Sequence, residues 1–140
     1  MSEFPITIFH NPACGTSRNT LAIIRAAGYE PTVVDYLQAG WTRPQLEELF
    51  AAAKLRPRQA MREKGTPAEE LGLLDANVSE HTIIDAMVAN PILVNRPFVV
   101  TSKGTVLSRP SEVVLSVLDK RPASFTKEDG EVVRIDPKSH

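Results

Sequence analysis

Cysteine is almost absent from this chain of 140 residues, in which Cys14 is the single example. One cysteine forms no disulfide within the chain, so the fold does not depend on disulfide bonds. If Cys14 takes part in redox chemistry, the second sulfur must come from another molecule. The formal net charge of −1 gives no general attraction to nucleic acid or to an acidic membrane surface, so neither is expected as a partner.

Long apolar runs are also missing. No segment approaches the ~20 apolar residues that span a bilayer, so we expect no membrane association. The N-terminus has no basic region followed by an apolar stretch, so we expect no secretion signal and a cytoplasmic location. The sequence shows neither a cluster of metal ligands nor a nucleotide-binding loop, and we expect no metal and no bound cofactor.

The N-terminal part of the chain has a strand–helix–strand pattern. β-branched and aromatic residues predict strands over residues 6–9 and 32–36. Between them apolar residues recur at helical spacing, and Gly28 ends the predicted helix. The helix residues expected to face inward are Leu21, Ile23, Ile24 and Ala27. Two strands joined in this way form a βαβ unit, whose strands are parallel.

Residues 42–89 are predicted to form several short helices. Thr42 and Gln45 have the spacing of a capping box, and Ser79 is placed to cap the last helix. After the first cap, apolar residues recur at helical spacing at Leu46, Leu49, Phe50 and Ala53. The helix after the second cap is expected to bury Ile83, Ile84, Met87 and Val88. The segment between these helices is interrupted by Gly65, Pro67 and Gly72.

The hydrophobic period changes after this helical segment. Residues 98–100 and 105–107 are predicted to be short strands, joined by a hairpin turn that contains Gly104. Pro110 opens a final predicted helix. Its inward residues are Val113, Val114, Val117 and Leu118. The polar residues that follow are expected to be loosely ordered.

A βαβ half followed by a ββα half is the plan of the thioredoxin-like fold. The predicted fold class is therefore α/β, thioredoxin-like, with a helical insertion between the βαβ and ββα halves. We expect one domain over residues 1–140, with the insertion at about 42–90 and a polar C-terminal tail at about 121–140.

The turn-rich residues 10–17 lie between the end of the first strand and the start of the first helix, and they contain Cys14. Ligands in open α/β sheets bind at the carboxyl ends of strands. The free N–H groups and the dipole of a helix N-terminus favour an oxyanion there, and they also favour thiolate over thiol. Cys14 is therefore a candidate nucleophile with an oxyanion site beside it.

The neighbours of this cysteine have properties that suit anion binding. Gly15 allows a ligand to approach the backbone closely, and Thr16 and Ser17 add hydroxyl donors. His10 and Arg18 are placed to add positive charge. A lone cysteine is more often a small buried apolar residue, and a histidine at a strand end often binds only backbone, but these loop-forming neighbours do not suit a core.

Two other cysteine chemistries are excluded by counting. Small phosphatases that attack oxyanions carry Cys, five residues and then Arg, whereas Thr20 stands at that position after Cys14. A Cys-x-x-Cys pair is also absent, because Ser17 occupies the place of the second cysteine. A dithiol oxidoreductase that works alone is therefore excluded.

The sequence HNPACGTSRNT at residues 10–20 closely resembles the active-site loop of the glutaredoxin-coupled arsenate reductases. Further segments similar to that family are residues 69–73, 95–100, 109–114 and 125–130. The similarity extends over almost the whole chain and is weakest over residues 38–58 and after 130.

The resemblance implies the same thioredoxin-like fold with a helical insertion, and it implies roles for single residues. Cys14 falls on the catalytic cysteine, and His10 falls on its assisting histidine. The anion-holding arginines that it implies are Arg62, Arg96 and Arg109. Arg58 competes with Arg62 for the third of these positions. Pro97 falls on the family's cis proline.

The implied function is the reduction of arsenate to arsenite through a covalent adduct on Cys14. Arsenate carries between about one and two negative charges at neutral pH, much as phosphate does, and guanidinium groups bind such oxyanions through paired hydrogen bonds. The resemblance implies glutathione as the external reductant. It also implies glutaredoxin as the partner that resolves the mixed disulfide.

Two alternatives stay open beside this function. One is a thioredoxin-like regulatory binding module, although regulators of that kind use a Cys-x-x-Cys switch, which Ser17 removes. The other is a glutathione-dependent oxidoreductase acting on another oxyanion. The arginine set argues against an uncharged disulfide substrate, but it does not separate arsenate from other oxyanions.

Overall fold

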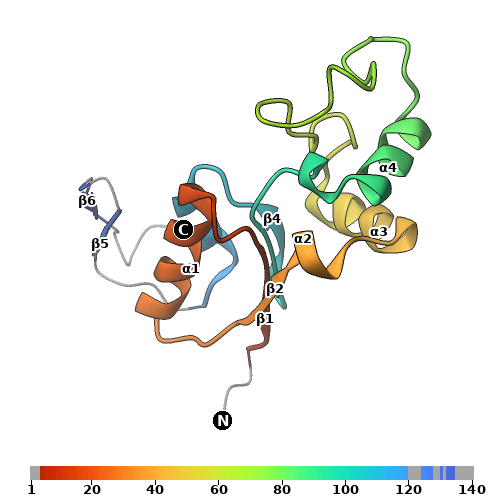
Figure 1. Cartoon of the computed structure of the whole chain (residues 1–140). Coiled ribbons are helices and arrows are strands. Elements are labelled where there is room, and N and C mark those ends of the chain that lie inside the picture. Colours follow the sequence, from red (N-terminus) through yellow and green to blue (C-terminus); the bar gives the residue numbers. More distant parts are fainter. Residues whose placement is uncertain (1–3, 120–123, 128–129, 131, 135–140) are drawn as a thin grey trace. The chain divides into compact units, whose positions relative to one another are not determined.

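The computed structural model of the chain describes residues 4–119, 124–127, 130 and 132–134. The chain forms two compact units (Figure 1). The first contains the residues up to Asp35 and those from Arg96 onward, and the second is Tyr36–Asn95. Within the described residues, no helix has the length and apolar character needed to cross a bilayer.

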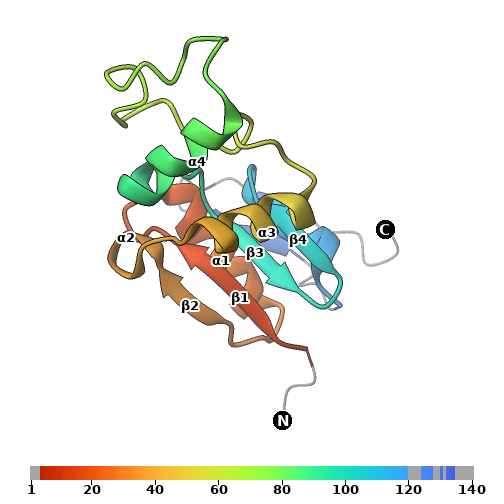
Figure 2. The same cartoon turned by 90° about the vertical axis from the view of Figure 1, so that its right-hand side faces the viewer.

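The first unit is built on a four-stranded sheet with the strand order β2-β1-β3-β4 (Figure 2). Its strands are β1 (Ile6–His10), β2 (Thr32–Asp35), β3 (Phe98–Thr101) and β4 (Gly104–Leu107). β1 is parallel to β2 and antiparallel to β3, which pairs with β4 in an antiparallel hairpin. The predicted βαβ unit and hairpin are confirmed, although β2 ends one residue early because Tyr36 begins a helix.

α1 (Gly15–Ala26) connects β1 to β2 and packs against one face of the sheet. Its Ile23 and Ile24 side chains are fully buried among the inward residues of β1, which alternate along the strand. Gly28 follows the helix with a φ of 99°, a left-handed conformation that glycine adopts without a steric penalty. The predicted helix and its end are confirmed.

The predicted final helix is present as a 3₁₀ helix, η2 (Ser111–Val117), rather than as an α-helix. Val114, Val117 and Leu118 are buried as predicted, but Val113 is only half-buried. Side chains three residues apart lie on one side of a 3₁₀ helix, which directs Val114 and Val117 together into the core.

Part of the predicted C-terminal tail, residues 121–140, lies outside the described residues. The described part contains a small antiparallel sheet of β5 (Ser124–Thr126) and β6 (Val132–Arg134), so the expectation of loose order is wrong there. Phe125 packs against the core of the first unit and anchors β5. Strands of three residues show too little alternation of apolar and polar residues to be predicted from sequence.

The second unit is mainly helical. Its elements are α2 (Tyr36–Ala39), α3 (Arg43–Ala53), α4 (Glu80–Ala89) and the 3₁₀ helix η1 (Pro91–Leu93). The capping box of Thr42 and Gln45 and the Ser79 cap are both confirmed. Val88 was predicted to face inward but is 37% exposed. It lies about 100° around the helix from the buried Met87, at the edge of the apolar stripe.

Residues 54–79 form turns instead of the predicted additional short helices. Gly65 and Gly72 adopt φ values of 74° and 73°, which an α-helix does not accommodate. Several backbone carbonyls of this segment bind the side chain of Arg58. A side chain therefore supplies hydrogen bonds that helical backbone would otherwise make.

Candidate active site

The loop after β1 brings Cys14 to the N-terminus of α1, where Cys14 is the N-cap residue. Its N–H donates to the carbonyl of Asn11 at 3.0 Å, and its carbonyl accepts the N–H of Arg18 at 3.0 Å. The side-chain oxygen of Asn11 accepts the N–H of Ala13 at 2.9 Å. These bonds form a tight turn that holds the half-buried sulfur beside the first N–H groups of α1.

Two arginines reach Cys14 from the open end of the β3–β4 hairpin. Arg96 lies just before β3, and Arg109 lies just after β4. Arg109 Nη1 donates to Cys14 Sγ at 3.7 Å and to the carbonyl of Arg96 at 2.9 Å. Arg96 is 9% exposed, so its charge lies inside the site. The structure thus brings together the cysteine and two of the three arginines that the sequence indicates.

The electrostatic surroundings of Cys14 favour the thiolate. Burial raises the pKa of the Cys14 thiol, because a charge is poorly solvated in the protein interior. Hydrogen bonds from the N–H of Ser17 and from the guanidinium groups of Arg109 and Arg96, together with the charge of Arg96, outweigh burial. The net result is a thiol pKa below that of an ordinary cysteine, as expected of a nucleophilic cysteine.

His10 is buried and contacts Ser17, with 2.6 Å between His10 Nδ1 and Ser17 Oγ. Burial lowers the pKa of His10, Asp35 raises it, and Arg18 and Arg25 lower it further. The net lowering keeps the imidazole neutral at neutral pH. His10 therefore acts on the cysteine loop through a hydrogen bond to Ser17, which differs from the positive charge that the sequence led us to expect.

The residues after Cys14 contribute mainly through their backbone. Ser17 Oγ is fully buried and accepts the N–H of Asn11 at 3.1 Å besides its contact with His10, so its hydroxyl serves the loop itself. The N–H of Ser17 is the group that faces the sulfur. Gly15 and Thr16 begin α1 and are half-buried, which leaves the first turn of the helix accessible to an anion.

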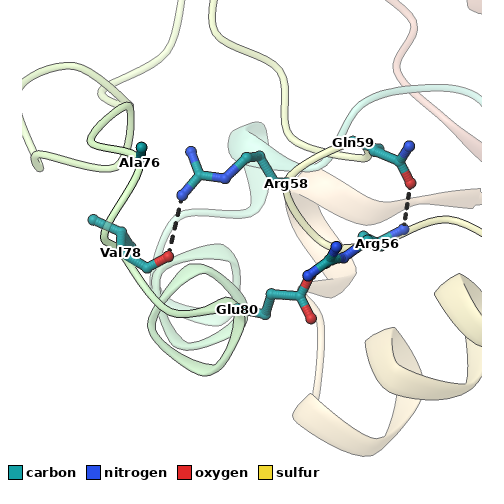
Figure 3. A pocket seen from close by; sticks show the side chains of 6 residues that line it. All are labelled: Arg56, Arg58, Gln59, Ala76, Val78 and Glu80. Atoms are coloured by element: carbon teal, nitrogen blue, oxygen red, sulfur yellow. Dashed lines mark hydrogen bonds and ion pairs between the residues drawn. The ribbon is translucent and has the colours of Figure 1, made fainter.

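Arg58 and Arg62 both belong to the second unit, and their side chains have different partners. Arg58 donates to the carbonyls of Leu73 at 3.2 Å, Asp75 at 2.9 Å and Val78 at 3.1 Å. Figure 3 shows the bond to Val78. Arg62 donates from Nε to the carbonyl of Lys64 at 3.2 Å. Three carbonyls of its own unit therefore engage the Arg58 side chain.

A comparison with protein-family models gives one decisive result, because the model described as "ArsC family" matches residues 9–117. The chain belongs to the ArsC family. The matched segment includes the Cys14 loop and both arginines of the hairpin. It also spans the whole second unit, so the ArsC match is not limited to a short motif.

Several ArsC relatives are similar over nearly their full length. The arsenate reductase of Rhizobium meliloti (strain 1021) is 61% identical over 129 residues, which cover 91% of this chain and 92% of the relative. The arsenate reductase of Escherichia coli (strain K12) is 52% identical with the same coverage. Among solved structures, the arsenate reductase from Vibrio cholerae has a TM-score of 0.79 and 35% identity, and the match covers 84% of this chain and all of that one. The thioredoxin-like fold is therefore confirmed.

Two features of the site were not predicted. The peptide bond before Pro97 is cis, as the family resemblance implies, but the bond before Pro110 is cis as well. Asn11 is 3% exposed and organises the loop through its side chain and both of its backbone groups. An Asn-Pro pair at the end of a strand is a turn signal, so Asn11 was open to prediction from the sequence.

Proposed function

We propose that this chain reduces arsenate to arsenite with Cys14 as the nucleophile. The single observation that carries the proposal is the placement of Cys14 Sγ at the N-terminus of α1, 3.7 Å from Arg109 Nη1. A thiolate, two guanidinium groups and a helix N-terminus in one place suit an anionic substrate that is attacked at its central atom. The names of the ArsC relatives make arsenate the substrate of choice.

In the first step, the Cys14 thiolate attacks arsenic and forms a sulfur–arsenic bond. One arsenate oxygen leaves as hydroxide or water. Arg96, Arg109 and the first N–H groups of α1, at Gly15, Thr16 and Ser17, stabilise the charge on the remaining oxygens. These donors are held in place before the substrate arrives, so little reorganisation is needed.

His10 supports this step from behind the loop. Its contact with Ser17 and the bond from the Asn11 N–H fix the start of α1, and so fix the N–H groups that face the sulfur and the anion. His10 therefore belongs to the catalytic machinery as a positioning residue. Arg62 is proposed as the third anion-binding arginine. We further propose that the chain is one domain and that Arg62 belongs to a helical insertion in it, at about residues 42–90.

The second step requires a thiol from outside the chain, because Cys14 is its single cysteine. Glutathione thiolate attacks the sulfur of Cys14, and the electron pair of the sulfur–arsenic bond remains on arsenic. Arsenic gains two electrons and leaves as arsenite, while the two sulfurs form a mixed disulfide. Glutaredoxin then takes the glutathione by thiol–disulfide exchange and restores Cys14. A reducing, cytoplasmic location suits this cycle.

An omission assay tests the proposal. Purified protein is mixed with arsenate, glutathione and glutaredoxin, and arsenite is measured with each component left out in turn. We expect many turnovers in the complete mixture and none without glutathione. Sustained arsenite production with glutathione omitted and no other small thiol present contradicts the proposed second step.

A further inference from the structure

An ion pair in the first unit joins Lys127, the residue directly after β5, to Glu112 of η2. Lys127 Nζ lies 2.8 Å from Glu112 Oε1, and the two side chains are 12% and 29% exposed. The ion pair of Arg25 and Glu30 in the same unit is far more open, with side chains 50% and 75% exposed. A well-shielded amine keeps its charge only beside a partner, so the Lys127 pair constrains geometry more than a surface pair does.

The shielded ion pair continues into the segment that carries Arg109. Glu112 Oε1 also accepts the hydroxyl of Ser111 at 3.1 Å, and the carbonyl of Ser111 accepts the hydroxyl of Ser108 at 2.9 Å. The N–H of Ser108 donates to the carbonyl of Pro97 at 2.8 Å. Ser108 and Ser111 are 0% and 2% exposed.

These bonds fix the backbone on both sides of Arg109. From that fixed backbone, the Arg109 side chain reaches the carbonyl of Arg96 and the sulfur of Cys14. Charge-assisted hydrogen bonds to a tetrahedral oxyanion depend strongly on direction, and a misplacement of about 1 Å costs much of their effect. The position of Arg109 therefore depends on what holds residues 108–111.

We propose that Lys127 and Glu112 are positioning residues that hold Arg109 toward the oxyanion and Cys14. Lys127 fixes the Glu112 carboxylate, and that carboxylate gives Ser111 a fixed acceptor beside the Arg109 segment. The residue that follows β5 thereby helps to bind arsenate, although it contributes no group to the reacting atoms. This inference rests on the proposed arsenate chemistry.

The test compares two neutral variants, Lys127→Met and Glu112→Gln, with their double variant. Because Arg109 binds the anion less well without the ion pair, the KM for arsenate should rise roughly fivefold in each single variant. The double variant should show about the same rise as either single variant, because both changes break one connection. The pKa of Cys14, measured from its alkylation rate by iodoacetamide against pH, should rise in all three.

Lys103→Met is the matched control. Lys103 Nζ lies 4.0 Å from Asp119 Oδ1, and the two side chains are 47% and 61% exposed. Loss of this exposed pair should change neither the KM for arsenate nor the pKa of Cys14. A rise of KM in the double variant to the product of the single effects overturns the proposal, as does equal behaviour of Lys103→Met and Lys127→Met. The proposal is also overturned if the single variants fold and have the same KM for arsenate and the same Cys14 pKa as the unmodified protein.

Two further points keep the outcome decisive. Glu112→Gln is nearly isosteric, so it carries the test alone if Lys127→Met does not fold as judged by circular dichroism. The alkylation measurement needs no arsenate. If the unmodified protein does not reduce arsenate, the proposed function fails, while the pKa of Cys14 in the variants still decides whether the ion pair positions Arg109.

Discussion

Arginines gather in both units of the chain, but their partners differ. In the first unit, Arg109 donates to the sulfur of Cys14, and Arg96 lowers the pKa of that sulfur. In the second unit, Arg58 donates to three backbone carbonyls, and Arg56 forms an ion pair with Glu80. All three of these charged side chains line one pocket (Figure 3).

The number of arginines in a unit therefore does not show where an anion binds. A guanidinium group that binds several carbonyls is already engaged and stabilises a loop. A guanidinium group that lies beside a thiolate at a helix N-terminus makes the local electrostatic potential more positive. A substrate oxyanion can replace water and bind there. Substitutions in the two units should therefore separate into effects on catalysis and effects on stability.

The largest expected effect is that of Cys14→Ser in the first unit. The variant should fold but produce no measurable arsenite, because a serine hydroxyl is a far weaker nucleophile than a thiolate at neutral pH. Arsenite formation with glutathione and glutaredoxin measures activity, and circular dichroism checks the fold. Arsenite production at a comparable rate would mean that Cys14 is not the nucleophile.

The next largest effect is expected for Arg96→Lys. A lysine keeps the charge but loses the planar pair of donors, so kcat/KM for arsenate should fall by an amount equivalent to roughly 1–3 kcal/mol. Arg25→Lys is the control, since Arg25 forms an exposed ion pair with Glu30 and lysine keeps its charge. The site assignment is wrong if the two lysine variants have the same kcat/KM.

A smaller effect is expected on the titration of Cys14. Because the pKa of the thiol is lowered in the folded protein, Cys14 should still be alkylated fast at a pH below the pKa of an ordinary cysteine. Its alkylation should slow only when the pH falls below the lowered pKa. Arg109→Gln should raise this pKa by roughly one unit. His10→Ala should raise it by less, because His10 acts through Ser17. A pKa at the ordinary cysteine value in the unmodified protein removes this electrostatic account.

The smallest effect on catalysis is expected for Arg58→Met. Loss of its bonds to three carbonyls should lower the free energy of unfolding by roughly 1–3 kcal/mol, measured by urea denaturation, while the KM for arsenate stays unchanged. Arg62→Met should do the reverse, with a KM raised roughly fivefold and little change in stability. If the KM for arsenate rises in Arg58→Met and not in Arg62→Met, then Arg58 is the anion-binding arginine and Arg62 is not.

Much of the fold was predictable because its signals are local. The capping box of Thr42 and Gln45, the Ser79 cap and the positive φ of Gly28 each depend on a few neighbouring residues. The parallel pairing of β1 and β2 was predictable from the helix between them, because a strand–helix–strand unit within one sheet has parallel strands. The conversion of the last helix to η2 was not predictable, since the choice between 3₁₀ and α-helical hydrogen bonds depends on packing.

The candidate site was predictable to a lesser degree. Cys14, Arg96 and Arg109 were found from the loop and the family resemblance, and the geometry joins them. The sequence did not indicate that His10 contacts Ser17, because a histidine next to a helix N-terminus has several available partners. Nor did it connect Lys127 with Glu112, since no local sequence pattern pairs a residue after a short strand with a residue of the preceding 3₁₀ helix.

Intact-mass measurement of the protein mixed with arsenate alone tests the central claim most directly. Without any small thiol, the reaction should stop after the first step, and the protein should gain the mass of arsenate less one water on Cys14. Cys14→Ser should gain nothing under the same gentle conditions, and adding glutathione with glutaredoxin should remove the added mass and release arsenite. Arsenite release by the protein with no adduct at any stage, or an equal adduct on Cys14→Ser, would contradict the account.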